Sequence, residues 1–100
     1  DDFFEAEGTE DLQNIVLMRP QSEIEIDVKK ALSTIPEIRG ITHIYCHYLN
    51  QELTVQVNIL LDVEMLIRDA QKIASAARQK IEEIKDIDAA DLHLELDDAL

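Results

Sequence analysis

The sequence is poor in several residue types, and each shortage excludes a class of protein. Its 100 residues include two glycines, two prolines, one cysteine and no tryptophan. With so few glycines it has no glycine-rich phosphate-binding loop. A single cysteine, Cys46, cannot form an internal disulfide, which fits a reducing compartment. No stretch approaches the roughly 20 apolar residues of a transmembrane helix, and no signal peptide is visible.

Basic residues are also scarce. Nine Lys and Arg stand against 22 Asp and Glu, for a formal net charge of −13. Such a surface repels phosphate backbones and anionic membranes, so nucleic-acid binding is disfavoured. It attracts cations, although acidity of this size also serves solubility alone. No serine lies beside a base in a catalytic motif, and no carboxylate stands out in an apolar setting, so we expect no enzymatic activity.

The hydrophobic fraction of 46% is ample for the core of one domain. Residues 1–12 carry acidic and no basic side chains, which indicates a solvated tail, and residues 97–100 form a second acidic tail. The folded domain is expected over residues 13–96. Within it, the apolar run at residues 15–18 fits either an edge strand or a hydrophobic arm. The chain begins with Asp1 and not Met, so we expect a fragment or a processed product.

A first helix is predicted over residues 23–34. Ser22 and Glu25 have the spacing of a capping box, and apolar residues then recur at helical spacing on one face: Ile24, Val28, Ala31, Leu32 and Ile35. Pro36 ends the helix.

Two strands and a second helix follow. Residues 41–49 suit a strand, and residues 52–61 alternate between apolar and polar side chains. Asn50-Gln51 between them indicates a tight hairpin. Asp62 is expected to cap a helix whose apolar stripe, which includes Leu66, runs to about residue 84.

Residues 91–96 form a third strand, with Leu92, Leu94 and Leu96 on one face and Asp91, His93 and Glu95 on the other. The third strand should run parallel to the second. The fold class is therefore α+β, of αββαβ order, with two helices on one face of a small mixed sheet.

The register between the two strands of the hairpin determines on which face of the sheet the potential metal ligands lie. If Leu49 lies opposite Glu52, His43 faces Asn58 and His47 faces Thr54. His43, Tyr45 and His47 then share one face, while Ile44, Cys46 and Tyr48 face the helices. On the third strand, His93 and Glu95 oppose the leucines and point to the same polar face.

Imidazole and carboxylate groups are ligands for zinc, manganese or iron. His43 and His47 lie roughly 13 Å apart along the strand, too far to chelate one ion together. We therefore expect a site of His43 with His93 and Glu95, or separate weak sites that include His47. The alternative is that three surface histidines share a polar face by chance.

Four segments carry a family resemblance. They are Ile35-Pro36-Glu37-Ile38-Arg39-Gly40-Ile41, Val55-Gln56-Val57-Asn58-Ile59, Leu66-Ile67-Arg68-Asp69-Ala70-Gln71-Lys72-Ile73-Ala74 and Leu92-His93-Leu94-Glu95. In this order and spacing they resemble the cytoplasmic C-terminal domain of cation diffusion facilitator transporters, over roughly residues 17–96. The resemblance implies a ferredoxin-like or metallochaperone-like fold and a cytoplasmic homodimer. It also implies a domain without enzyme activity that regulates cation export by an attached transmembrane transport domain. Such a domain binds divalent cations at the interface between its two subunits, and zinc is the expected metal.

By position, the resemblance also implies that His43, His93 and Glu95 match metal-binding positions of that family. Asn58 and Gln71 instead stand where metal-binding members have histidine, and amides are poor zinc ligands. Two alternatives therefore stay open: a metal-independent structural dimerisation domain, and a small-molecule regulatory domain of ACT type. The second would need residues 15–18 to form a strand.

Overall fold

The computed structural model describes residues 19–97, and its elements follow one another in the predicted order. Helix α2 (Gln21–Leu32) precedes strands β1 (Gly40–Leu49) and β2 (Glu52–Asp62), and helix α3 (Ile67–Glu82) leads into strand β3 (Ala89–Asp97). The predicted tail over residues 1–12, the apolar run at 15–18 and residues 98–100 lie outside the described part. Within residues 19–97, no helix is long and apolar enough to cross a membrane.

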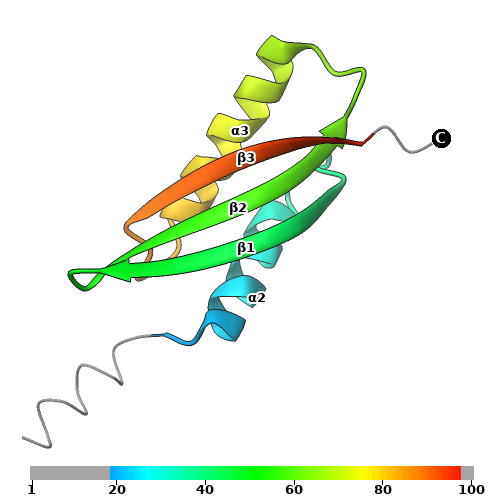
Figure 1. Ribbon diagram of the computed structural model, residues 1–100. Helices are drawn as coiled ribbons and strands as arrows, with labels where there is room; N and C mark the ends of the chain where they lie inside the picture. Colours follow the sequence, from blue (N-terminus) through cyan, green and yellow to red (C-terminus); the bar gives the residue numbers. More distant parts are fainter. Residues whose placement is uncertain (1–18, 98–100) are drawn as a thin grey trace, which may run out of the picture.

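The strands form one mixed sheet in the order β1-β2-β3. β1 pairs antiparallel with β2, and β3 pairs parallel with β2. Both helices lie against the same side of this sheet (Figure 1). The other side, which no described helix covers, is called the open face below. The predicted α+β architecture is confirmed.

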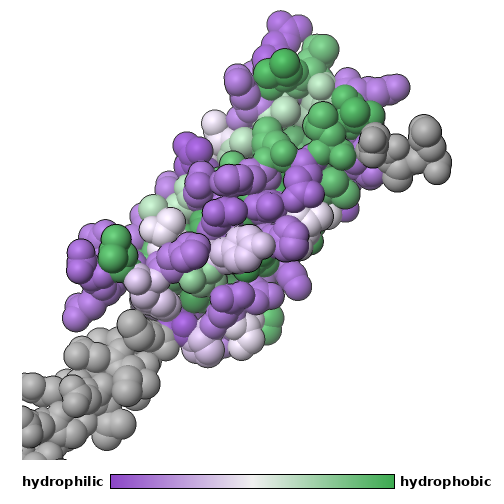
Figure 2. All heavy atoms as spheres, viewed as in Figure 1, coloured by the Kyte–Doolittle hydropathy of each residue, from purple (hydrophilic) through white to green (hydrophobic). Residues whose placement is uncertain are grey.

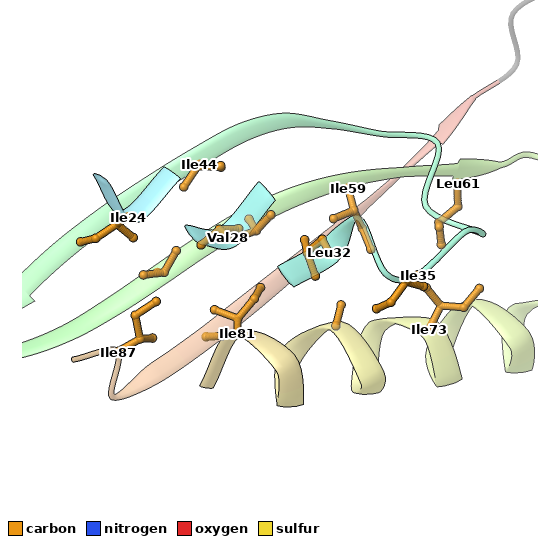
Figure 3. Close-up of a cluster of buried hydrophobic side chains, with 14 of the residues drawn as sticks. Ile24, Val28, Leu32, Ile35, Ile44, Ile59, Leu61, Ile73, Ile81 and Ile87 are labelled. Atoms are coloured by element: carbon orange, nitrogen blue, oxygen red, sulfur yellow. The ribbon is translucent and has the colours of Figure 1, made fainter. Parts of the chain in front are cut away.

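The alternating pattern of β2 determines which face is open. Every second residue of this strand is buried: Leu53, Val55, Val57, Ile59 and Leu61. These side chains meet apolar residues of both helices (Figure 3), among them Ile24, Val28, Leu32, Ile73, Ala77 and Ile81. Burying one such side chain stabilises the fold by about 1.5–3 kcal/mol. The intervening polar residues of β2 are therefore forced onto the open face.

The hairpin between β1 and β2 forms without glycine. Leu49 pairs with Glu52, as predicted, and the two loop residues have positive φ, 52° at Asn50 and 68° at Gln51. Two-residue hairpin loops favour this left-handed conformation because its twist matches that of the strands. Asn tolerates it well, whereas Gln adopts it at a cost.

Helix α2 does not use the predicted capping box. It begins at Gln21, so Ser22 lies inside the helix, and Pro20 is the N-cap residue without a side-chain capping bond. The Pro20 carbonyl accepts hydrogen bonds from the amides of Glu23 and Ile24, at 3.1 and 3.3 Å. Proline has no N–H of its own to satisfy, and its restricted φ suits a helix start. The helix ends at Leu32, two residues earlier than predicted.

Helix α3 begins five residues after Asp62, which was predicted to cap it. Asp62 is the last residue of β2. Its Oδ1 accepts a hydrogen bond from the Glu64 amide at 2.9 Å, and its Oδ2 pairs with Arg39 at 2.8 Å. The Asp62 side chain therefore stabilises the turn after β2, and the N-cap of α3 is Leu66, which forms no side-chain capping bond.

Strand β3 is longer than predicted, and Asp97 belongs to it. Leu92 packs against the core, but Leu94 and Leu96 are exposed. The leucine face of this edge strand is therefore covered only in part.

Candidate functional site

The open face carries one row of polar residues across all three strands. Asn58 of β2 pairs with His43 of β1 on one side and with His93 of β3 on the other. Both histidines are exposed and Asn58 is half-buried. The predicted hairpin register is confirmed, and the two imidazoles emerge on the same face.

These histidines do not form a chelate within one chain. Asn58 separates His43 from His93, so their backbones lie two strand spacings apart, about 10 Å. Among residues 19–97, no three His, Cys, Asp or Glu side chains come close enough to hold a metal ion. The chain brings potential ligands to one face without assembling them.

His47 lies further along β1, opposite Thr54 near the hairpin. It is exposed and lies about 13 Å along the strand from His43. It therefore belongs to no common site with His43 in this chain.

Glu95 is held by two hydrogen bonds on one oxygen. Thr42 donates from Oγ1 to Oε2 at 2.6 Å, and Asn58 donates from Nδ2 to the same oxygen at 3.1 Å. These two bonds, with a smaller electrostatic contribution from His43, hold the pKa of the Glu95 carboxyl below its usual value. The two hydrogen bonds therefore favour the charged form of the carboxyl.

Two further contacts on the open face were not predicted. His93 Nε2 lies 3.3 Å from Asp91 Oδ2, two residues away on the same face of β3. The His43 and Tyr45 rings stack with centroids 5.7 Å apart. The alternation of β3 placed Asp91 on the same face as His93 and Glu95, but it did not indicate the contact between Asp91 and His93.

Thr42 was missed because β1 is not regular. The pairing of β1 with β2 shifts between Ile41 and His43, leaving Thr42 as an extra residue. Strict alternation would place Thr42 on the helix side, away from Glu95. No feature of the residue pattern signals this bulge.

Cys46 lies on the helix side of β1, as predicted, where it is half-buried and packs against the core. Burial raises the pKa of its thiol. A protonated, shielded thiol is a weak nucleophile and a weak metal ligand.

Apolar side chains are exposed at the end of the molecule where β2 leads into α3 (Figure 2). Leu66 was predicted to join the core, but 56% of it is exposed, because α3 begins only after it. We call this surface the end patch; its residues are Val63, Leu66, Ile67, Leu94 and Leu96. Exposed apolar surfaces of this kind mark interaction sites.

Comparison with known proteins gives a family and a fold. The family described as "Cation efflux protein, cytoplasmic domain" matches residues 20–97. A MamM-CTD variant superposes with a TM-score of 0.71 at 20% identity, covering 79% of this chain and 100% of its own.

A copper form of another MamM-CTD variant gives a TM-score of 0.71 at 20% identity over 79% of this chain and 100% of that chain. A third MamM-CTD variant gives a TM-score of 0.71 at 20% identity, covering 78% of this chain and 96% of that chain. No curated protein matches. At this identity the structural likeness shows a shared fold.

Proposed function

Because this chain belongs to the family of cation efflux protein cytoplasmic domains, we propose that it regulates a divalent cation efflux transporter as a homodimer that binds the cation on its open face. An attached transmembrane domain would transport the cation across the membrane. Zinc is the first candidate, with manganese and iron as alternatives, because imidazole and carboxylate ligands suit these ions.

The observation that carries this proposal is that His43, His93 and Glu95 all lie on the open face. Each is a possible metal ligand that has too few other ligands beside it to complete a site. Imidazole and carboxylate donors fit a divalent cation chemically. Residues 19–97 of one chain offer too few of them at one point, so a cation would be shared between two copies. The ion would offset repulsion between two acidic protomers and favour a closed dimer.

The end patch supports the homodimer. Its residues are exposed apolar side chains of β3, of the first turn of α3 and of the segment between β2 and α3. The family supplies the reason to expect a second copy, since it consists of dimerisation domains, and the exposed apolar side chains are the reason to propose that the copy packs at the end patch. Leu94 and Leu96 also flank Glu95 on the edge strand, so a dimer at the end patch would bring the two Glu95-bearing strands near each other.

The test is calorimetric titration of zinc and of manganese into chelator-stripped protein, comparing the wild type with His93→Ala and His47→Ala. The His47 variant is the matched control, because it also removes an exposed imidazole from the open face. We expect His93→Ala to weaken binding and His47→Ala to leave it unchanged. Equal heats from the wild type and His93→Ala would refute the assigned site.

A second candidate function is metal-independent dimerisation. It is favoured by the partners that Glu95 and His93 already have within the chain and by the amide of Asn58 at the centre of the row. It predicts a stable dimer in chelator whose size does not change when metal is added. Light scattering with and without chelator separates the two functions.

The ACT-type alternative rests on residues 15–18, which lie outside the described part. Membership of the cation efflux family favours the transporter function over it. A regulatory role of this kind requires no catalysis by the domain.

A further inference from the structure

A groove lies between the end of α2 and the start of β1. It has a volume of about 250 Å³, and the residues that line it are Lys29, Leu32, Ser33, Ile38, Gly40 and Ile41. Leu32 is buried, and Ile38 and Ile41 are partly buried against the core. The groove is separate from the open face, because Ile41 pairs with Ile59, whose side chain is buried on the helix side. It therefore offers an apolar surface with the charge of one lysine beside it.

The charge beside the groove is unusual for this chain. Lys29 and Lys30 are the only two adjacent basic residues of the sequence, and both lie in the last turn of α2. Both are exposed, and neither forms an ion pair with another residue of the part that the structure describes. A ligand that is both apolar and acidic would match the groove and these two charges.

The segment before Arg19 contains a ligand of this kind. Its first residues, Asp1-Asp2-Phe3-Phe4-Glu5, join the only two phenylalanines of the sequence to three carboxylates, and no basic residue precedes Arg19. Aromatic side chains have a large apolar surface to bury. The carboxylates on either side of them can pair with lysine.

The length of the chain determines which part of this segment can reach the groove. Arg19 is fixed at the beginning of α2, since its amide donates to the Tyr48 hydroxyl at 3.1 Å and its guanidinium pairs with Asp27 at 2.6 Å. The groove lies at the other end of this 12-residue helix, about 18 Å away. The apolar run at residues 15–18 spans at most roughly 14 Å and cannot reach it, whereas the 15 residues between Phe4 and Arg19 can span roughly 50 Å.

We infer that Phe3 and Phe4 dock in the groove between α2 and β1, while the carboxylates beside them pair with Lys29 and Lys30. This inference goes beyond the proposed function, because it requires no cation. The segment would then be held against the domain, and not solvated as its charge alone predicts. The alternative is that the two lysines only complement the dipole at the end of α2. In that case their charge affects the stability of the helix but holds no segment.

The test is fluorine NMR of the whole chain labelled with fluorophenylalanine, which reports on residues 3 and 4 alone because the chain has no other phenylalanine. It is carried out in chelator, with a labelled peptide of residues 1–12 as the reference for the undocked segment. We expect the two signals of the protein to differ from those of the peptide, and Lys29→Glu to move them to the peptide positions. Lys72→Glu is the matched control, since it makes the same charge change at an exposed position of α3 and should leave the signals in place.

The Phe3→Ala/Phe4→Ala double variant provides an independent measurement, because it changes no residue of the described fold. The backbone amide signals of Ser33, Ile38 and Gly40 should shift in it relative to the wild type. Peptide-like fluorine signals in the wild type, or unchanged groove amides in the double variant, would overturn the inference and leave the proposed function intact. Docking that is lost on dilution would assign the segment to the groove of a second copy and would overturn docking within one chain. Failure to bind zinc or manganese would overturn the proposed function and not this inference.

Discussion

Asn58 of β2 donates a hydrogen bond from Nδ2 to Oε2 of Glu95 on β3, with the two atoms 3.1 Å apart. Thr42 of β1 donates to the same oxygen, so all three strands meet at one carboxylate atom. In a chain with a net charge of −13, Glu95 is therefore distinguished by its neighbours and not by its charge. Its ionisation and its surroundings can both be tested.

The two hydrogen bonds to Glu95 should be detectable in an acid titration, through the pKa of its carboxyl group. The pKa of Glu95 is lowered in the folded chain by Thr42, Asn58 and, more weakly, His43. A group with a lowered folded pKa stabilises the protein above its unfolded pKa, and this contribution is lost as the pH falls through the folded value. We expect the Glu95 carboxyl to titrate below the ordinary glutamate value of about 4.3, measured by NMR of its side-chain carbon. Thr42→Val should raise that pKa, and titration at or above the ordinary value in the wild type would contradict the hydrogen-bond network.

Asn58→His should strengthen zinc binding. It would place a third imidazole between His43 and His93 in one row across the sheet. The new nitrogen ligand should outweigh the lost amide bond to Glu95 and raise the affinity at least about tenfold, or ~1.4 kcal/mol. Gln56→His is the control, because Gln56 pairs with Tyr45 and Asp91 and has no histidine on either side. If the two variants bind zinc equally, the row is not a metal-binding geometry.

Leu66→Asp should disrupt the homodimer without unfolding the chain. Leu66 is 56% exposed in the end patch, so the charge costs little in the monomer but would be buried in a dimer formed there. Leu49→Asp is the control, since Leu49 is 73% exposed at the hairpin, outside the end patch. Sedimentation or light scattering should show a monomer for the first variant and a dimer for the second. A Leu66→Asp protein that remains fully dimeric would move the interface away from the end patch.

Gln51→Gly should stabilise the domain, because Gln51 has a φ of 68° that glycine adopts freely. The left-handed conformation costs a residue other than glycine roughly 1–2 kcal/mol, part of which the substitution recovers. Gln71→Gly, on the exposed side of α3, should instead cost about 1 kcal/mol. Denaturant unfolding of both variants gives the two signs, and a destabilising Gln51→Gly would contradict the hairpin conformation.

Much of the fold could be predicted from one strand. The alternation of β2 is regular, since each of Leu53, Val55, Val57, Ile59 and Leu61 is buried. Together with a two-residue hairpin, it determined the partners of His43 and His47. The shared face of His43, His93 and Glu95 followed from these pairings.

The sequence-based predictions were wrong where the local preference of a residue was overridden by its contacts with residues distant in the sequence. Asp62 has the chemistry of a helix cap, but its carboxylate is engaged with Arg39 and the Glu64 amide, so α3 starts later. That delay leaves Leu66 exposed. The bulge at Thr42 depends on the fit between β1 and β2 and has no pattern of its own. Consequently, the sequence placed Glu95 on the open face but did not reveal Thr42, one of the two donors that hold it.

Paramagnetic broadening by manganese tests the central claim most directly, because it reports where on the chain a divalent cation binds. Mn²⁺ would be added in small amounts to isotope-labelled protein, with diamagnetic Mg²⁺ as the control. Binding on the open face predicts that signals of Thr42, His43, Asn58, His93 and Glu95 broaden first, while those of Glu82 and Glu83 at the end of α3 persist. Broadening centred on Glu82 and Glu83, or spread evenly over the acidic residues, would contradict a cation site on the open face.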